Sequence, residues 1–149
     1  MAVITNEPTS KFRYGNPVVD CGSAQARVQC RQLATVLTVT GGIDDSNLAS
    51  VAAQARRCIL AEKPFVLDLS GVASFGLSSI DLLDVVNGWC LTVGDDWSLV
   101  TSPAVTKVLL AHGAQGAFAT VTSVEDALHH FSDSMRARRR LLPILNKSA

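Results

Sequence analysis

The sequence predicts a single α/β domain with a mostly parallel sheet of four to six strands flanked by four helices. Short β-branched or apolar runs alternate with segments whose apolar residues recur at helical spacing, which is the pattern of strands joined by crossover helices. The chain has 149 residues, close to the usual size of one domain. With 48% apolar and 17% charged residues it can bury a core, which excludes wholesale disorder and fibrous classes.

Five short runs have the composition of strands. The run over 36–40 is β-branched and is closed by Gly41 and Gly42, and the run over 65–69 is continuously apolar, as expected of a strand covered on both faces. Alternation with helices favours parallel pairing, whereas antiparallel pairing stays open for the first two strands, which follow each other directly. The predicted strands are 28–30, 36–40, 65–69, 97–100 and 118–122.

Four amphipathic segments are expected to be helices. Each is preceded or started by a residue whose side chain suits an N-cap, where a hydroxyl or carboxylate accepts from a free backbone N–H. The predicted helices are 46–62, 78–91, 103–112 and 123–135. The candidate caps are Asp44, Asp45 or Ser46 for the first helix, Ser78 for the second, Ser102 before Pro103 for the third, and Ser123, with Asp126 three residues later, for the fourth.

Charge divides the chain unevenly although the formal net charge is zero. All 13 acidic residues precede residue 136, and five of the 13 basic residues lie in the segment from 136 onward. We therefore expect an extended N-terminal arm over 1–17, a domain over 18–135 and a basic tail over 136–149. Such a tail is usually solvated, so no direct nucleic-acid partner is expected. No apolar run approaches the ~18 residues of a membrane span, and a signal-peptide pattern is missing, which predicts a cytoplasmic protein without membrane contact.

The sequence lacks the motifs of common catalytic and cofactor sites. It contains neither a GxGxxG nor a GxxxxGK[ST] phosphate loop. His112, His129 and His130 do not have the spacing of metal ligands, and no metal or cofactor is expected. The stretch 76–80 has the first glycine of a GxSxG nucleophile elbow and not the second, which makes a hydrolase using Ser78 a remote interpretation and helix capping the commoner role. We expect a protein that is not an enzyme.

The four cysteines are widely spaced and include no CxxC pair. Cys58 and Cys90 fall on inward positions of predicted helices, and buried thiols in apolar surroundings are unreactive. We expect reduced, structural thiols. A redox-responsive module is the alternative, and its candidate residues are Cys21, Cys30, Cys58 and Cys90.

Three stretches resemble one known family: 41–44 (GGID), 65–72 (FVLDLSGV) and 75–80 (FGLSSI). They are similar to the STAS family, named for sulfate transporters and anti-sigma factor antagonists. The order and spacing of residues 102–127 support the likeness, which covers roughly residues 18–131. The resemblance implies a STAS-like α/β fold. It also implies a regulatory module that binds an anti-sigma factor, a histidine-kinase-like protein, and thereby releases a sigma factor.

In the bacterial antagonists of this family, the second serine of a loop that reads roughly F-x-D-S-S-G-L is phosphorylated by the anti-sigma factor. An ungapped comparison places that serine on Ser78, and a one-residue insertion would place it on Ser79. Three neighbours depart from the pattern, because the family's aspartate, first serine and glycine fall on Gly76, Leu77 and Ser79. The partner-binding residues that the resemblance implies are Asp44, Asp45, Ser46, Gly76, Leu77, Ser78, Ser79 and Asp81.

Physical chemistry connects such a site to regulation. A phosphate on Ser78 adds up to about two negative charges near Asp44, Asp45 and Asp81, which would oppose docking to an acidic partner surface. The competing class is a ligand-sensing STAS module that binds a nucleotide or another small molecule in a groove between the Asp44 loop and the Ser78 helix start. The sequence leaves open whether the protein is a monomer or a homodimer.

Overall fold

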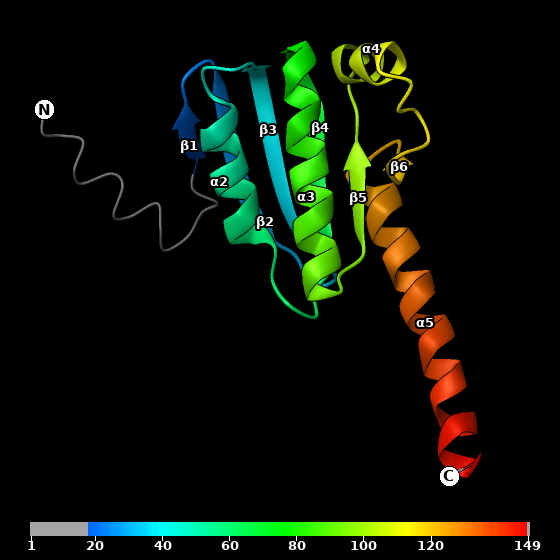
Figure 1. Ribbon diagram of the computed structural model, residues 1–149. Coiled ribbons are helices and arrows are strands. Elements are labelled where there is room, and N and C mark those ends of the chain that lie inside the picture. Colours follow the sequence, from blue (N-terminus) through cyan, green and yellow to red (C-terminus); the bar gives the residue numbers. More distant parts are fainter. Residues whose placement is uncertain (1–17, 149) are drawn as a thin grey trace, which may run out of the picture.

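The computed structural model describes the backbone of residues 18–148 and the side chains of residues 18–139; the expected arm over 1–17 lies outside the described residues. Six strands form one sheet in the order β1-β2-β3-β4-β5-β6 (Figure 1). The pairs β1–β2 and β2–β3 are antiparallel, and β3–β4, β4–β5 and β5–β6 are parallel. The strands are β1 (Val18–Cys21), β2 (Ala24–Cys30), β3 (Thr35–Ile43), β4 (Phe65–Phe75), β5 (Trp97–Val100) and β6 (Thr120–Val121).

The helices lie on both faces of the sheet. Figure 1 shows α2 and α3 side by side across one face, while α5 packs beside β5 and β6 and covers part of the other face. Within the described residues, no helix is long and apolar enough to cross a bilayer. The helices are α2 (Leu48–Cys58), the 3-10 turn η1 (Leu77–Ser79), α3 (Ile80–Val93), α4 (Pro103–Ala111) and α5 (Val124–Ser148).

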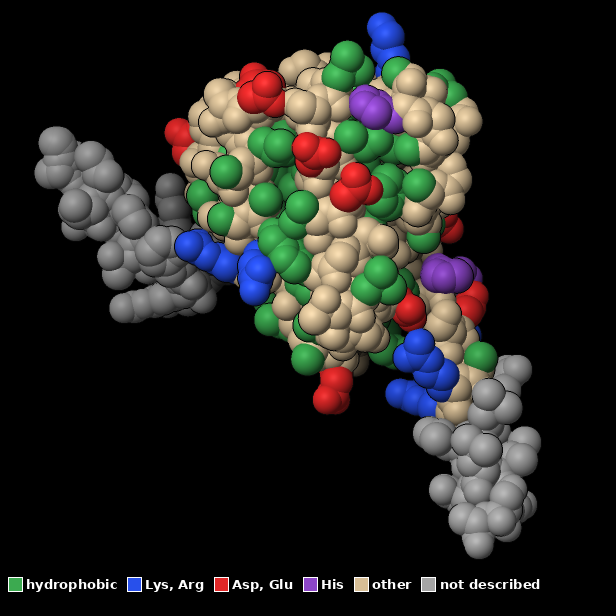
Figure 2. All heavy atoms as spheres, in the orientation of Figure 1, with side chains coloured by type: hydrophobic (Ala, Val, Ile, Leu, Met, Phe, Trp, Pro, Cys, Tyr) green, Lys and Arg blue, Asp and Glu red, His purple; other side chains and the backbone are tan. Residues whose placement is uncertain are grey.

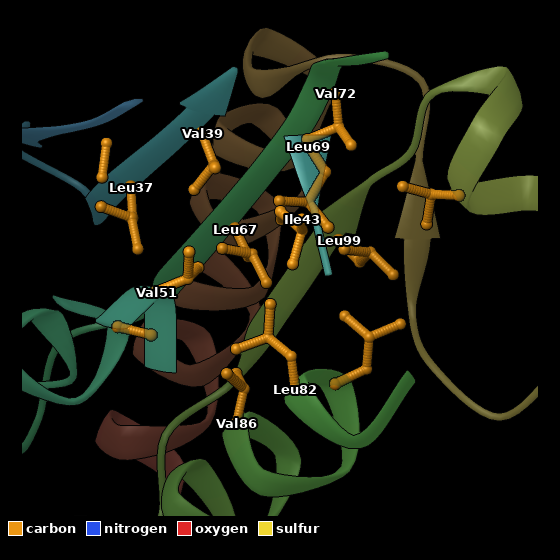
Figure 3. Packing of buried hydrophobic residues seen from close by; sticks show 14 of the residues in the cluster. Leu37, Val39, Ile43, Val51, Leu67, Leu69, Val72, Leu82, Val86 and Leu99 are labelled. Atoms are coloured by element: carbon orange, nitrogen blue, oxygen red, sulfur yellow. The ribbon is translucent and has the colours of Figure 1, made fainter. Parts of the chain in front are cut away.

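The main core lies between the sheet and the helices α2, α3 and α4. Leu37, Leu67 and Leu99 stand directly opposite one another on β3, β4 and β5 and are fully buried. Val51 of α2 and Leu82 of α3 belong to the same cluster (Figure 3). Burying one such aliphatic side chain contributes about 1.5–3 kcal/mol to folding. This row therefore anchors the parallel half of the sheet under the two helices.

A smaller cluster lies on the opposite face. Strand residues alternate between faces, so Val36 and Val66, which are paired in register, point away from the main core. Ala127 and Phe131 of α5 cover them and are buried. This second cluster holds the first turns of α5 on the sheet.

The predicted α/β architecture is confirmed, and so is the antiparallel pairing that stayed open for the first two predicted strands. The predicted strand lengths are wrong in several places. β1 had no predicted counterpart. β2 begins at Ala24 rather than near Val28; Ala24 and Ala26 have low strand propensity and so give no strand pattern in the sequence, but both are buried against the core. β3 continues through Gly41, which lies in a bulge of the β3–β4 ladder rather than ending the strand.

Two more strands differ from the prediction. β4 extends to Phe75, because the Ser70-Gly71 pair, which has the composition of a turn, is followed by the inward residues Val72 and Phe75. The final strand is shorter than its predicted 118–122 and comprises only Thr120 and Val121.

Some features of the predicted helix ends are confirmed and others are wrong. Ser102 caps α4 by accepting from the Val105 N–H at 3.3 Å, and Ser123 accepts from the Asp126 N–H at 3.0 Å, as predicted. The first helix ends at Cys58 instead of residue 62, because Ile59 is already extended. The last helix runs to Ser148, so the predicted basic tail continues a helix rather than following one.

Candidate functional site

Two loops meet where the parallel strands β3 and β4 end. The β3–α2 loop comprises residues 44–47, and the β4–α3 loop comprises residues 76–79; together we call them the paired loops. Ile43 and Phe75 form the last pair of the β3–β4 ladder, which brings the loops together. The Ile43 carbonyl accepts from the Gly76 N–H at 2.9 Å and from the Ser79 hydroxyl at 3.2 Å. Loops at the carboxyl ends of parallel strands are a common position for functional groups.

Ser78 links the paired loops from the solvent side. Its side chain is exposed, and its hydroxyl donates a hydrogen bond to the carboxylate of Asp45. The predicted capping role of Ser78 is wrong, because the chain forms the turn η1 here and α3 begins only at Ile80 without a side-chain cap. The Ser78 hydroxyl was expected to accept from a helix N–H. Instead, it donates to Asp45 of the neighbouring loop.

The other candidate serine, Ser79, has a different environment. It is fully buried, and its hydroxyl donates to the Ile43 carbonyl. Leu77, in contrast, is 64% exposed at the tip of the same loop. Of the two adjacent serines, only Ser78 presents its hydroxyl to a partner in this conformation.

The β3–α2 loop is ordered by its own side chains. The Asp44 carboxylate accepts from the Ser46 N–H at 2.9 Å and from the Ser46 hydroxyl. These bonds stabilise the charged form and lower the pKa of the Asp44 carboxyl. The prediction that Asp44, Asp45 or Ser46 caps the first helix is wrong, because the N-cap position belongs to Asn47 and no side chain closes it. The carboxylates form a local turn and the contact to Ser78 instead.

Asn47 is the organising residue that the sequence did not reveal. It is buried, and its amide nitrogen donates to the Cys21 carbonyl at 2.9 Å and the Gly42 carbonyl at 2.8 Å. Its amide oxygen accepts from the Asp44 N–H at 2.9 Å. One side chain therefore ties β1, β3 and the β3–α2 loop together. An asparagine that follows two aspartates in a turn has no sequence signal that separates such a hub from an ordinary loop residue.

Gly41 allows the close strand contact under this hub. Its φ is +95°, and a Cβ on Gly41 would stand 2.4 Å from the Ser23 carbonyl oxygen. Both the left-handed conformation and the close approach require glycine. Gly41 is thus a structural requirement for the site.

The surface beside the paired loops combines acidic and apolar side chains. Asp81 and Asp84 are exposed on α3, next to Val85, which is 40% exposed. Figure 2 shows carboxylates among hydrophobic side chains on this face of the molecule. The structure therefore gathers all the sequence-predicted partner-binding positions around one edge: Asp44, Asp45 and Ser46 from one loop, Gly76, Leu77, Ser78 and Ser79 from the other, and Asp81 from the first turn of α3.

The four thiols do not form one site. Cys21, Cys58 and Cys90 are buried, whereas Cys30 is exposed at the end of β2. Burial raises the pKa of Cys58 to about 11 and that of Cys90 to about 12, which keeps both thiols protonated at neutral pH.

Hydrogen bonds join the two loops between which the ligand-sensing alternative places its groove: Ser78 binds Asp45, and Ser79 binds the Ile43 carbonyl. An open hollow of about 760 Å³ lies elsewhere, at the start of α4, and its lining includes Lys107 and Asp126. In the described part of the chain, no group of three or more His, Cys, Asp or Glu side chains is placed to hold a metal ion.

Comparison with known proteins identifies the family of this chain. The family model described as "STAS domain" matches residues 25–127. Osmosensory protein A of Mycobacterium tuberculosis is 40% identical over 156 residues, which cover 97% of this chain and 99% of the relative. The chain belongs to the STAS domain family.

Solved structures are similar in fold. An anti-sigma factor antagonist from Mycobacterium paratuberculosis superposes with a TM-score of 0.66 at 20% identity, covering 74% of this chain and 95% of that one. An anti-sigma-factor antagonist (STAS) domain protein from Planctomyces limnophilus gives a TM-score of 0.61 at 19% identity, covering 72% and 97%. At these identities the likeness establishes the fold, which is that of anti-sigma factor antagonist STAS domains.

Proposed function

We propose that this protein is a cytoplasmic anti-sigma factor antagonist that binds an anti-sigma factor through the paired loops and the adjacent face of α3, thereby releasing a sigma factor. The observation that carries the proposal is the position of Ser78. Its exposed hydroxyl bridges to Asp45 beside the exposed side chain of Leu77. This arrangement supports a surface that recognises a partner and that one modification can alter.

Phosphorylation of Ser78 by the anti-sigma factor, acting as a histidine-kinase-like serine kinase, would end the complex. A phosphoserine oxygen has no proton to donate to Asp45, so the bridge between the loops would be lost. The phosphate would also stand beside the carboxylates of Asp45 and Asp81, and neighbouring negative charges repel one another. The first effect removes the outer contact between the paired loops, and the second changes the charge of the docking surface.

The chemistry of the surface suggests the character of the partner. Exposed carboxylates of Asp81 and Asp84 beside the apolar side chains of Leu77 and Val85 fit a partner surface with basic groups around an apolar contact. Charge complementarity of this kind speeds association and sets specificity more than it adds affinity.

Affinity for the cognate anti-sigma factor tests the proposal. Ser78→Glu should weaken binding at least about tenfold, whereas Ser78→Ala should bind within a few-fold of the wild type because it adds no charge. Gln115→Glu, on the exposed turn after α4, adds the same carboxylate outside the paired loops and α3 and serves as the control. Incubation with the partner and ATP should give phosphoserine at Ser78. Unchanged affinity of Ser78→Glu together with an unmodified Ser78 would contradict the proposal.

The name of the relative adds a candidate input signal. Osmosensory protein A covers nearly the whole chain at 40% identity, which supports an osmotic or ionic input for this protein as well. Salt screens exposed carboxylates, while a neutral osmolyte changes water activity without screening. Affinity for the anti-sigma factor measured in potassium chloride and in sucrose of equal osmolality separates an ionic from an osmotic response. No change in either medium argues against this input.

A further inference from the structure

Two thiols converge at the end of the sheet opposite the paired loops. The register places Cys30 opposite Thr35, the first residue of β3. The helix α2 leaves the carboxyl end of β3 and returns antiparallel to it, so its last residue, Cys58, reaches the same end of the sheet as Thr35. Two thiols from separate parts of the sequence thus come from neighbouring element ends.

The two thiols also share a face of the sheet. Alternate residues of β2 point to the same side, and Ala24, Ala26 and Val28 pack into the core that contains Cys58. The ladder between β2 and β3 continues without a bulge to its last pair, so Cys30 points to that side as well. A thiolate charge on Cys30 contributes to raising the pKa of Cys58, which fits a short separation.

The two positions differ in access. Cys30 is exposed, and Cys58 is buried at the last position of α2. Both end their elements, with bends following Cys30 and extended backbone at Ile59, so small backbone movements there do not break a helix or a ladder. An exposed thiol beside a buried one is the arrangement of an attacking and a resolving cysteine.

We infer that Cys30 and Cys58 form an intramolecular disulfide when the protein meets a peroxide. The Cys30 thiolate attacks one peroxide oxygen, an S–O bond forms, the O–O bond breaks, and the leaving hydroxide takes a proton to become water. The Cys58 sulfur then attacks the sulfenic sulfur, the S–S bond forms, the S–O bond breaks, and the departing hydroxide takes the Cys58 proton. Two thiols are oxidised and one peroxide is reduced to two waters.

The buried hydroxyl of Thr35 lies at the same end of the sheet as the two thiols. It has no hydrogen-bond partner among the described residues, and it lies on the strand position opposite Cys30, on the same face. It makes no hydrogen bond to Cys58 in the reduced protein, but it is available to donate to the Cys58 sulfur when that sulfur moves toward Cys30 and loses its proton. Thr35→Val, which has the same shape without the hydroxyl, should therefore slow closure of the disulfide without preventing oxidation of Cys30.

Mass spectrometry of the full-length protein tests the inference without any partner. The reduced protein is treated with hydrogen peroxide, its remaining thiols are alkylated in denaturant, and it is cleaved after Arg, Lys and Glu without reduction. This cleavage releases Cys30 in 28–31 and Cys58 in 58–62, separate from Cys90. We expect these two peptides joined, lighter than their sum by two hydrogen atoms, while Cys21 and Cys90 stay alkylated.

Variants make the result specific. Cys30→Ser changes an exposed position and should abolish the joined peptide, whereas Cys90→Ala, which leaves the pair intact, should retain it. Circular dichroism checks that each variant is folded. Four alkylated cysteines after peroxide, a bond between any other cysteines, or a bond between two copies of the chain would overturn the inference. None of these outcomes bears on anti-sigma factor binding, so the two proposals fail independently.

Discussion

The hydroxyl of Ser78 donates to the carboxylate of Asp45 across 33 positions of sequence, and this contact closes the outer side of the paired loops. The inner side is closed by Ser79 on the Ile43 carbonyl. The two adjacent serines therefore have opposite roles. Ser79 belongs to the buried framework, while Ser78 connects that framework to the surface.

The Ser78–Asp45 contact should contribute little to stability. Both side chains are exposed, so we expect Ser78→Ala and Asp45→Asn each to lower the free energy of unfolding by less than about 1 kcal/mol. Urea denaturation of the two single variants and the double variant measures the coupling. A double variant whose loss equals the sum of the single losses would contradict a direct bond.

Loss of the Asn47 amide should be much more costly. Asn47→Ala leaves the carbonyls of Cys21 and Gly42 without their donor in a buried position, and we expect a loss of about 2–3 kcal/mol. Asn47→Asp keeps the size and the acceptor but cannot donate, so it should be destabilised at least as much. A loss below about 0.5 kcal/mol for both variants in urea denaturation would show that Asn47 does not hold the loop.

Two glycines make a matched pair for backbone effects. Gly41→Ala places a Cβ against the Ser23 carbonyl at a positive φ, and should destabilise the fold by at least about 2 kcal/mol. Gly88 lies within α3, and a Cβ there meets no atom within 4 Å. Gly88→Ala should therefore raise the free energy of unfolding by about 0.5–1 kcal/mol. Thermal unfolding of both variants checks the opposite signs, and a shift in the same direction would contradict the assignment.

A buried leucine and an exposed leucine provide a comparison of core and surface substitutions. Leu67 is fully buried at the centre of the β3–β5 row, and Leu67→Ala should cost about 2–5 kcal/mol through lost burial and a cavity. Leu91 is 72% exposed on α3, and Leu91→Ala should change stability by less than about 0.5 kcal/mol. Chemical denaturation compares them directly. Similar losses at the two positions would be inconsistent with the described packing.

Thiol reactivity should follow burial and pH. Only the thiolate reacts with iodoacetamide, and with pKa values of about 11 for Cys58 and about 12 for Cys90 the thiolate fraction at a pH of about 8 is roughly a thousandth or less. The exposed Cys30 should react first in the native protein. Reaction of the buried Cys58 and Cys90 should become faster with rising pH or on adding denaturant. Peptide mapping follows each site. Modification of Cys90 as fast as Cys30 under native conditions would refute this order.

The sequence predicts the architecture well because most of it depends on periodicity. Leu67 and Leu99 lie in continuous apolar runs, and Val105 and Val108 recur at helical spacing, so local composition indicates both their element and their face. The boundaries depend on tertiary context. Gly41 has the composition of a turn, but it continues β3 because a bulge in the ladder to β4 accommodates it.

The position of the site is more predictable than its contacts. Local patterns place Ser78 and Asp45 near element ends, and the topology brings such ends together. Which hydrogen bonds form there depends on atoms distant in the sequence. Ser78 was expected to cap a helix but binds Asp45, and the hub residue Asn47 acts through Cys21, 26 positions earlier. A pattern in one segment cannot specify such partners.

The unequal lengths of β4 and β5 leave an open border in the sheet. β5 pairs only with Phe65–Asp68, so the second half of β4 has no strand on that side. Unpaired strand borders are templates on which another chain can add and aggregate. Here α4 packs against β4, with Val105 and Leu109 in the same cluster as Leu69. We therefore expect α4 to shield this part of β4, and we expect chains in which α4 detaches to associate through the exposed strand.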